Sequence, residues 1–69
     1  MNTPIEEIAD ALDQHALQVR AAAHTVQDLA RHIEDRPVRM SFNEAAANLN
    51  AAEVHIAIAA VVLRNGGGA

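Results

Sequence analysis

The residues best suited to chemistry in this chain are its histidines, of which His24 and His32 flank Asp28 at intervals of four residues. Residues four apart lie on one face of a helix, so the three side chains would point the same way. Imidazole and carboxylate groups bind Zn²⁺ and similar divalent ions. However, His24 and His32 lie about 12 Å apart along a helix axis, so one ion would reach no more than two of the three. We therefore expect no metal site and predict that Asp28 pairs with Arg31, with a metal-binding helical bundle as the alternative.

His15 is a different candidate, because it interrupts an otherwise apolar row. The row has the alternating three- and four-residue spacing of a coiled-coil seam. Its members are Ile5, Ile8, Leu12, His15, Val19, Ala22, Val26, Leu29 and Ile33. A polar residue in such a seam fixes the register or the oligomeric state at some cost in stability. If the ring is buried, the neutral imidazole is favoured and stability falls as the pH decreases; the alternative is a partly buried ring satisfied by water.

No pattern typical of an active site occurs in the chain. It has no G-x-S-x-G, P-loop or H-E-x-x-H sequence and no cysteine. The hydroxyls of Thr3 and Ser41 are expected to cap helices rather than to act as nucleophiles. Carboxylates early in the chain are expected at a helix N-terminus, where they interact favourably with the helix dipole. These carboxylates are Glu6, Glu7, Asp10 and Asp13. We expect no enzymatic activity and no cofactor.

Composition argues against two further classes of partner. Five basic and nine acidic residues give a net charge of -4, which disfavours the neutralisation of phosphates that supports nucleic-acid binding. The longest apolar stretch, from Val54 to Leu63, covers about 10 residues, against the roughly 20 that a spanning helix needs. The first residues lack the basic and apolar regions of a signal peptide. We therefore expect no nucleic acid, no membrane and a cytoplasmic location.

Two helix start signals divide the chain. Residues 3–6 (TPIE) and 41–44 (SFNE) both place a hydroxyl three residues before a Glu, as in a capping box, and Met40 and Ala45 are spaced for a hydrophobic staple. Pro37 disfavours helical conformation in the residue before it. These signals predict two helices joined by a short connection.

The predicted helices cover residues 4–34 and 42–64. Together they form one hairpin domain over residues 1–65, followed by a disordered Gly-rich tail over residues 66–69. Because a short connection favours antiparallel neighbours, we expect an all-α, antiparallel two-helix hairpin.

Rows of small and large residues predict how the helices pack. In the first helix, the alanines at 9, 16, 23 and 30 each precede a large apolar residue by three positions. In the second helix, large residues recur at 42, 49, 56 and 63, and the first three precede the alanines at 45, 52 and 59 by three positions. An antiparallel register in which paired residue numbers add up to 75 matches large residues along the full length, with Ile33 opposite Phe42 and Leu12 opposite Leu63. Such packing is coiled-coil-like, with small residues beside large ones.

The second helix also has a surplus apolar side, which one partner helix cannot cover. In addition, the longer first helix would extend about two turns beyond the second and leave its first apolar residues uncovered. We therefore expect a homodimer that forms a four-helix bundle. His55, at the margin of the surplus side, is expected to be interfacial. The predicted dimer interface comprises Ile5, Ile8, Leu12, His15, Val54, Ile58, Val61 and Val62.

These features favour a small non-enzymatic protein–protein interaction or regulatory module, an adaptor or an inhibitor, that works as a homodimer with an unidentified protein partner. A dimerising hairpin also resembles the WXG100-type substrates of type VII secretion, which implies a secreted helical hairpin as a second alternative. That family is usually longer and carries Trp-x-Gly at the bend, whereas this bend reads DRPVR (35–39) and the chain has no Trp. The C-terminal residues also lack the family's Y-x-x-x-D/E signal. The resemblance is limited to architecture and carries over no residue.

Overall fold

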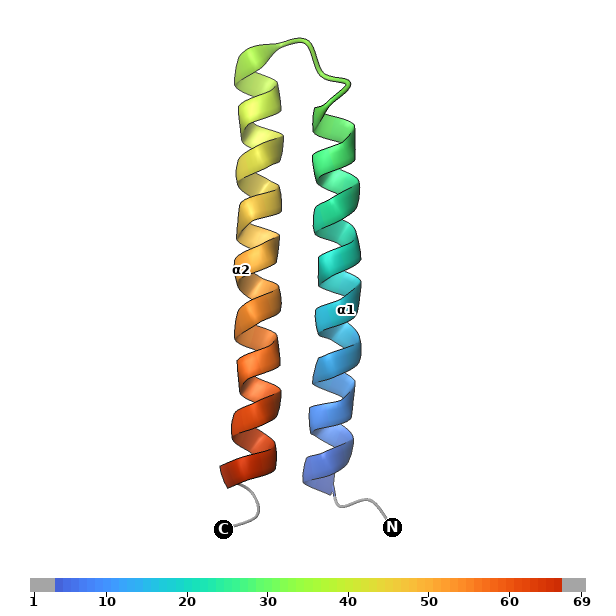
Figure 1. Ribbon diagram of the computed structural model, residues 1–69, viewed down its shortest axis with the longest axis vertical. Coiled ribbons are helices and arrows are strands. Elements are labelled where there is room, and N and C mark those ends of the chain that lie inside the picture. Colours follow the sequence, from blue (N-terminus) through green and yellow to red (C-terminus); the bar gives the residue numbers. More distant parts are fainter. Residues whose placement is uncertain (1–3, 67–69) are drawn as a thin grey trace.

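The structure, a computed structural model, describes residues 4–66 and consists of two helices. Helix α1 spans Pro4–Ala30 and helix α2 spans Arg36–Gly66. The helices lie side by side and run antiparallel along a rod that measures 51 × 18 × 10 Å (Figure 1). No strand occurs within residues 4–66. The predicted all-α hairpin is therefore confirmed.

The helix boundaries at the connection differ from the prediction. Helix α1 ends at Ala30 instead of residue 34, and α2 begins at Arg36 instead of residue 42. Asp35 explains the earlier start of α2, because it acts as the N-cap. Its Oδ1 accepts a hydrogen bond of 3.1 Å from the backbone N–H of Val38, and its carbonyl accepts one of 2.9 Å from the N–H of Arg39.

The chain between the helices satisfies much of its own backbone. The N–H groups of residues 31–33 donate to carbonyls three residues earlier at 3.1–3.2 Å, so the end of α1 tightens into a 3₁₀-type turn. The guanidinium of Arg39 donates to the carbonyl of Ile33, in the connection between the helices, at 3.3 Å. Pro37 lies in the first turn of α2, where its missing N–H removes no helical hydrogen bond. The segment predicted as a bend therefore starts a helix.

Ser41, predicted to cap the second helix, lies inside α2. Its Oγ donates a hydrogen bond of 3.2 Å to the carbonyl of Pro37, one turn earlier. Met40 is 58% exposed and Ala45 is also exposed, so neither forms the predicted staple. The capping-box prediction for residues 41–44 is wrong, because Asp35 provides a start signal six residues upstream.

The chain ends are only partly described. Helix α2 continues to Gly66, two residues beyond the predicted end. Thr3, predicted to cap the first helix, and residues 67–69 of the predicted tail lie outside the described residues. Helix α2, with 31 residues, is longer than α1, with 27, which reverses the predicted order of lengths.

Alanines alone are fully buried within residues 4–66. They are Ala9, Ala16, Ala23, Ala30, Ala46 and Ala60, each at most 7% exposed. The row of four in α1 repeats every seven residues, and the large apolar residues beside it are only half-buried. Small side chains allow the helix backbones to approach closely. The hairpin therefore has an alanine seam but no large side chain that is fully enclosed.

The seam on α1 uses the predicted row of alanines, whereas the seam on α2 is rotated from its predicted position. On α1 the structure buries Ala16 and leaves its neighbour His15 exposed; likewise Ala9 is buried and Ile8 is 53% exposed. On α2 the buried alanines are those at 46 and 60, not the predicted row at 45, 52 and 59. Close contact through the alanine row of α1 keeps the imidazole of His15 hydrated, whereas the predicted seam would have desolvated it without a partner.

The ion pairs between the helices agree with the predicted register. Arg20 pairs with Glu53, and Arg64 pairs with both Asp10 and Asp13. The residue numbers in these pairs add up to 73, 74 and 77, close to the predicted sum of 75. The rotation of the seam therefore left the relative level of the two helices unchanged.

Candidate interaction surfaces

One side of the hairpin carries the ion pairs between the helices, and we call it the polar edge. The guanidinium of Arg20 donates to Oε2 of Glu53 from Nε at 3.0 Å and from Nη2 at 2.7 Å. Nη2 of Arg64 donates to Asp10 at 2.8 Å and to Asp13 at 2.7 Å. These pairs are solvent-exposed for the most part, so they contribute little to stability. They do determine which side of the hairpin is charged.

Both arginines on the polar edge are held in the charged form. The hydrogen bonds that Arg20 donates to Glu53, and secondarily the negative charge of Glu53, raise the pKa of Arg20 above its ordinary value. The hydrogen bonds to Asp13 and Asp10 raise the pKa of Arg64 in the same direction. Each guanidinium therefore carries its positive charge beside a carboxylate at neutral pH. The net negative charge of the chain comes from its more numerous acidic residues.

Glu53 holds a position that the sequence reading missed. It lies midway between the buried Ala46 and Ala60, at the seven-residue spacing of the seam, and its side chain is only 16% exposed. Arg20 lies at the matching level of α1. A charged residue in an otherwise small-residue row, with an opposite charge at the complementary level, was the signal that could have identified the pair.

Within residues 4–66 the opposite side of the hairpin contains no Asp, Glu or Arg, and we call it the uncharged edge. Its members are Ile8, His15, Ala22 and Leu29 of α1 and Ala45, Ala52 and Ala59 of α2, all exposed or half-buried. The next row outward on each helix is uncharged as well. These outer rows hold Ala11, Gln18 and Thr25 of α1 and Ser41, Asn48, His55 and Val62 of α2. Within residues 4–66, every Asp, Glu and Arg lies elsewhere.

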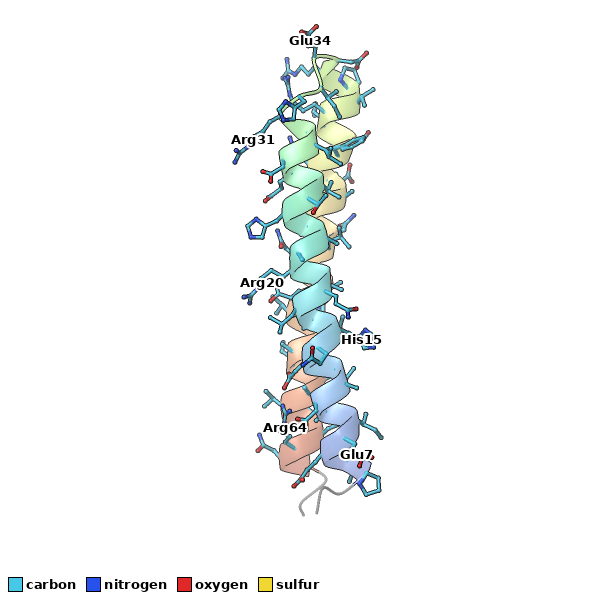
Figure 2. All side chains as sticks on the ribbon, turned by 90° about the vertical axis from the view of Figure 1, so that its right-hand side faces the viewer. Glu7, His15, Arg20, Arg31, Glu34 and Arg64 are labelled. Carbon is cyan, nitrogen blue, oxygen red and sulfur yellow. The ribbon has the colours of Figure 1, made fainter. Side chains whose placement is uncertain are left out.

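The two edges lie on opposite sides of the rod. Figure 2 shows the side chains of Arg20 and Arg64 at one side of the helix pair and that of His15 at the other. This agrees with helix geometry, because Arg20 and His15 are five residues apart on α1, which corresponds to about 140° of rotation. The hairpin is therefore charged on one side and neutral on the other.

A second apolar surface lies on the outer side of α2, and we call it the outer stripe. It consists of Val54, Ile58 and Val61, with Val62 at its border with the outer row of the uncharged edge, and all four are 53–62% exposed. Ile58 is two residues from each of the seam residues Ile56 and Ala60, and two residues correspond to about 200° of rotation. The outer stripe therefore points away from α1.

The residues predicted as one dimer interface are divided between these surfaces. Ile8 and His15 belong to the uncharged edge, and Ile5 and Leu12 are half-buried beside the seam. The other four are the outer stripe. A single flat partner cannot cover both surfaces, because they face different directions.

The metal-ligand candidates do not form a cluster. Within residues 4–66 no group of three or more His, Asp or Glu side chains could hold an ion. His24 and Asp28 are exposed on α1, whereas His32 lies in the turn after α1 has ended, so the regular helical spacing of the three is lost. Nη1 of Arg31 lies 3.9 Å from Oδ1 of Asp28, which confirms the predicted ion pair.

Helix α2 has one further property that bears on its environment. By length and composition alone it is apolar enough to cross a membrane, and only 11% of the relevant 18-residue window is buried in the hairpin. The sequence-based expectation of no membrane considered only the stretch from Val54 to Leu63, which His55 interrupts. A bundle helix covered on several sides has the same composition.

No family model, curated protein or solved structure matched the chain in comparisons with known proteins.

Proposed function

We propose that this protein is a small non-enzymatic interaction module, an adaptor or inhibitor of other proteins, that works as a homodimer with four helices. One observation carries the proposal: the hairpin fully buries six alanines and no larger side chain, while nine large apolar residues remain 44–62% exposed. Burying an alanine removes little apolar surface from water, so this seam contributes little stabilisation. A stable fold then requires that a second chain cover the larger side chains.

The exposed area supports the same conclusion. The chain exposes 5117 Å², whereas a compact folded monomer of 7.3 kDa exposes about 4,200 Å². The excess of about 900 Å² is similar to the roughly 800 Å² that each partner buries in a standard protein interface. The radius of gyration, 15.8 Å against about 11 Å for a compact domain of this length, reflects the same incomplete burial.

Sedimentation equilibrium of the full chain between about 1 and 100 µM tests the proposal. We expect a mass of twice 7.3 kDa and a melting temperature that rises with chain concentration, because dissociation accompanies unfolding. A folded species of 7.3 kDa with a melting temperature independent of concentration would contradict it. Pull-down with the dimer as bait then addresses the protein partner.

A further inference from the structure

We propose that the second copy packs on the uncharged edge, so that two hairpins meet neutral side to neutral side with their polar edges outward. This assignment rests on the proposed homodimer and adds which of the two apolar surfaces forms the interface between the copies. The occupant is another copy of this chain, and three properties of the described residues support it.

Charge is the first property. The hairpin has a net charge of -4, so two copies repel unless their charged groups stay apart and hydrated. Contact through the uncharged edge places no Asp, Glu or Arg of α1 or α2 in the interface. It also leaves the pairs of Arg20 and Arg64 in water, where they avoid the cost of burying an ion pair.

Continuity with the seam is the second property. The large residues that flank the alanine seam are half-buried by the partner helix, and the uncharged edge lies directly beside them. A second hairpin on this edge would therefore add to the burial of the large residues that flank the seam on both helices. Three adjacent rows of α1, the seam rows and the row of Ile8 and Leu29, would then face the core, as in helices of a four-helix bundle.

Extent is the third property. The uncharged edge runs along α1 from Ile8 to Leu29, about 32 Å at 1.5 Å per residue, and includes both helices. The outer stripe runs from Val54 to Val62, about 12 Å, on one helix. The excess exposed area of about 900 Å² requires a surface of the larger kind.

Charge placement at neighbouring positions tests the assignment. Ala22 lies on the uncharged edge, whereas Ala21 lies two residues from both seam residues Val19 and Ala23 and so points away from α2. Both alanines are exposed in the hairpin, so the matched variants Ala22→Glu and Ala21→Glu differ only in direction. By sedimentation equilibrium at pH 8, we expect Ala22→Glu to weaken dimerisation by about 100-fold or more and Ala21→Glu to leave it unchanged. Ile58→Glu, on the outer stripe, should also leave it unchanged.

A second measurement keeps the test valid if Ala22→Glu unfolds the chain. The protein has no cysteine, so the single-cysteine variants Ala22→Cys and Ala21→Cys each carry one thiol. We expect a thiol reagent to label position 22 at least about 10-fold more slowly than position 21 at high chain concentration. The difference should shrink on dilution, as the dimer dissociates.

The outcomes separate this inference from the proposed function. A folded wild-type monomer at 50 µM would contradict both. If the wild-type chain is a dimer that Ile58→Glu dissociates and Ala22→Glu does not, only the choice of surface is wrong. Equal labelling rates at positions 21 and 22 would lead to the same conclusion. Binding of the wild-type chain to neutral phosphatidylcholine vesicles in place of dimerisation would show that lipid covers the apolar residues and would overturn both.

Discussion

Replacing Asp35 by Ala should destabilise the protein far more than replacing Ser41 by Ala, although Ser41 has the stronger capping-box sequence. The carboxylate of Asp35 accepts the N–H of Val38 at 3.1 Å and so satisfies one of the donors that the start of α2 leaves open. Loss of an N-cap side chain costs about 1 kcal/mol, within a range of roughly 0.5–2. Ser41 lies inside α2, where Ala has the higher helix propensity, by up to about 0.5 kcal/mol.

Thermal unfolding monitored by circular dichroism at one fixed chain concentration provides the measurement. For a domain of this size, about 1 kcal/mol corresponds to a fall in melting temperature of roughly 4–8 °C. We therefore expect Asp35→Ala to melt several degrees lower and Ser41→Ala to melt at or slightly above the wild-type temperature. Asp35→Asn is the matched control, because Asn is an equally good N-cap and should recover most of the loss.

The reasoning would be refuted by two results. If Ser41→Ala lowers the melting temperature more than Asp35→Ala does, then α2 begins near residue 42 as the capping box predicts. If Asp35→Asn melts as low as Asp35→Ala, the side-chain hydrogen bond to Val38 is not the source of the effect. Fixed concentration matters in both comparisons, because a dimer's melting temperature depends on it.

Further predictions concern the seam, the polar edge, the uncharged edge and metal ions. Ala60→Leu overpacks a fully buried seam position and should lower the free energy of unfolding, measured by denaturant titration, by about 1–3 kcal/mol. Ala51→Leu, at an exposed position, should have little effect in the same measurement. Arg64→Met should cause a small loss of thermal stability that disappears in 1 M NaCl, since the pairs it removes are exposed and screened; a loss that persists in salt would argue for lost packing instead. His15→Leu replaces an exposed polar ring of the uncharged edge by an apolar side chain and should raise the melting temperature of the proposed dimer; an unchanged melting temperature would show that position 15 stays in water. Calorimetry with Zn²⁺, Ni²⁺ and Cu²⁺ should detect no tight stoichiometric binding, and binding abolished by His24→Ala would instead support the metal-binding alternative.

The sequence predicted the hairpin and its register because both depend on long periodic patterns. Seven-residue repeats of small and large residues specify which rows meet and at what level, and the cross-helix pairs of Arg20 and Arg64 agree with that level. The buried row of α1, from Ala9 to Ala30, was recognised for the same reason.

The remaining differences come from competition between similar local signals. Asp35 and Ser41 both qualify as helix caps, and their side-chain hydrogen bonds decide between them in the folded chain. On α2 the row of large residues has alanines on either side, at 45, 52 and 59 and at 46 and 60, so periodicity alone did not show which row forms the seam. The division into a polar and an uncharged edge depends on that choice and therefore became visible only in three dimensions.

The hairpin also determines the position of any domain attached to its two ends. The start of α1 and the end of α2 lie at the same end of a rod 51 Å long, so domains fused at these two points would emerge together (Figure 1). In a dimer whose two-fold axis runs along the rod, the fused bodies of both copies would share one end, as in a clamp. With the axis across the rod they would sit at opposite ends, and the protein would act as a spacer of about 50 Å.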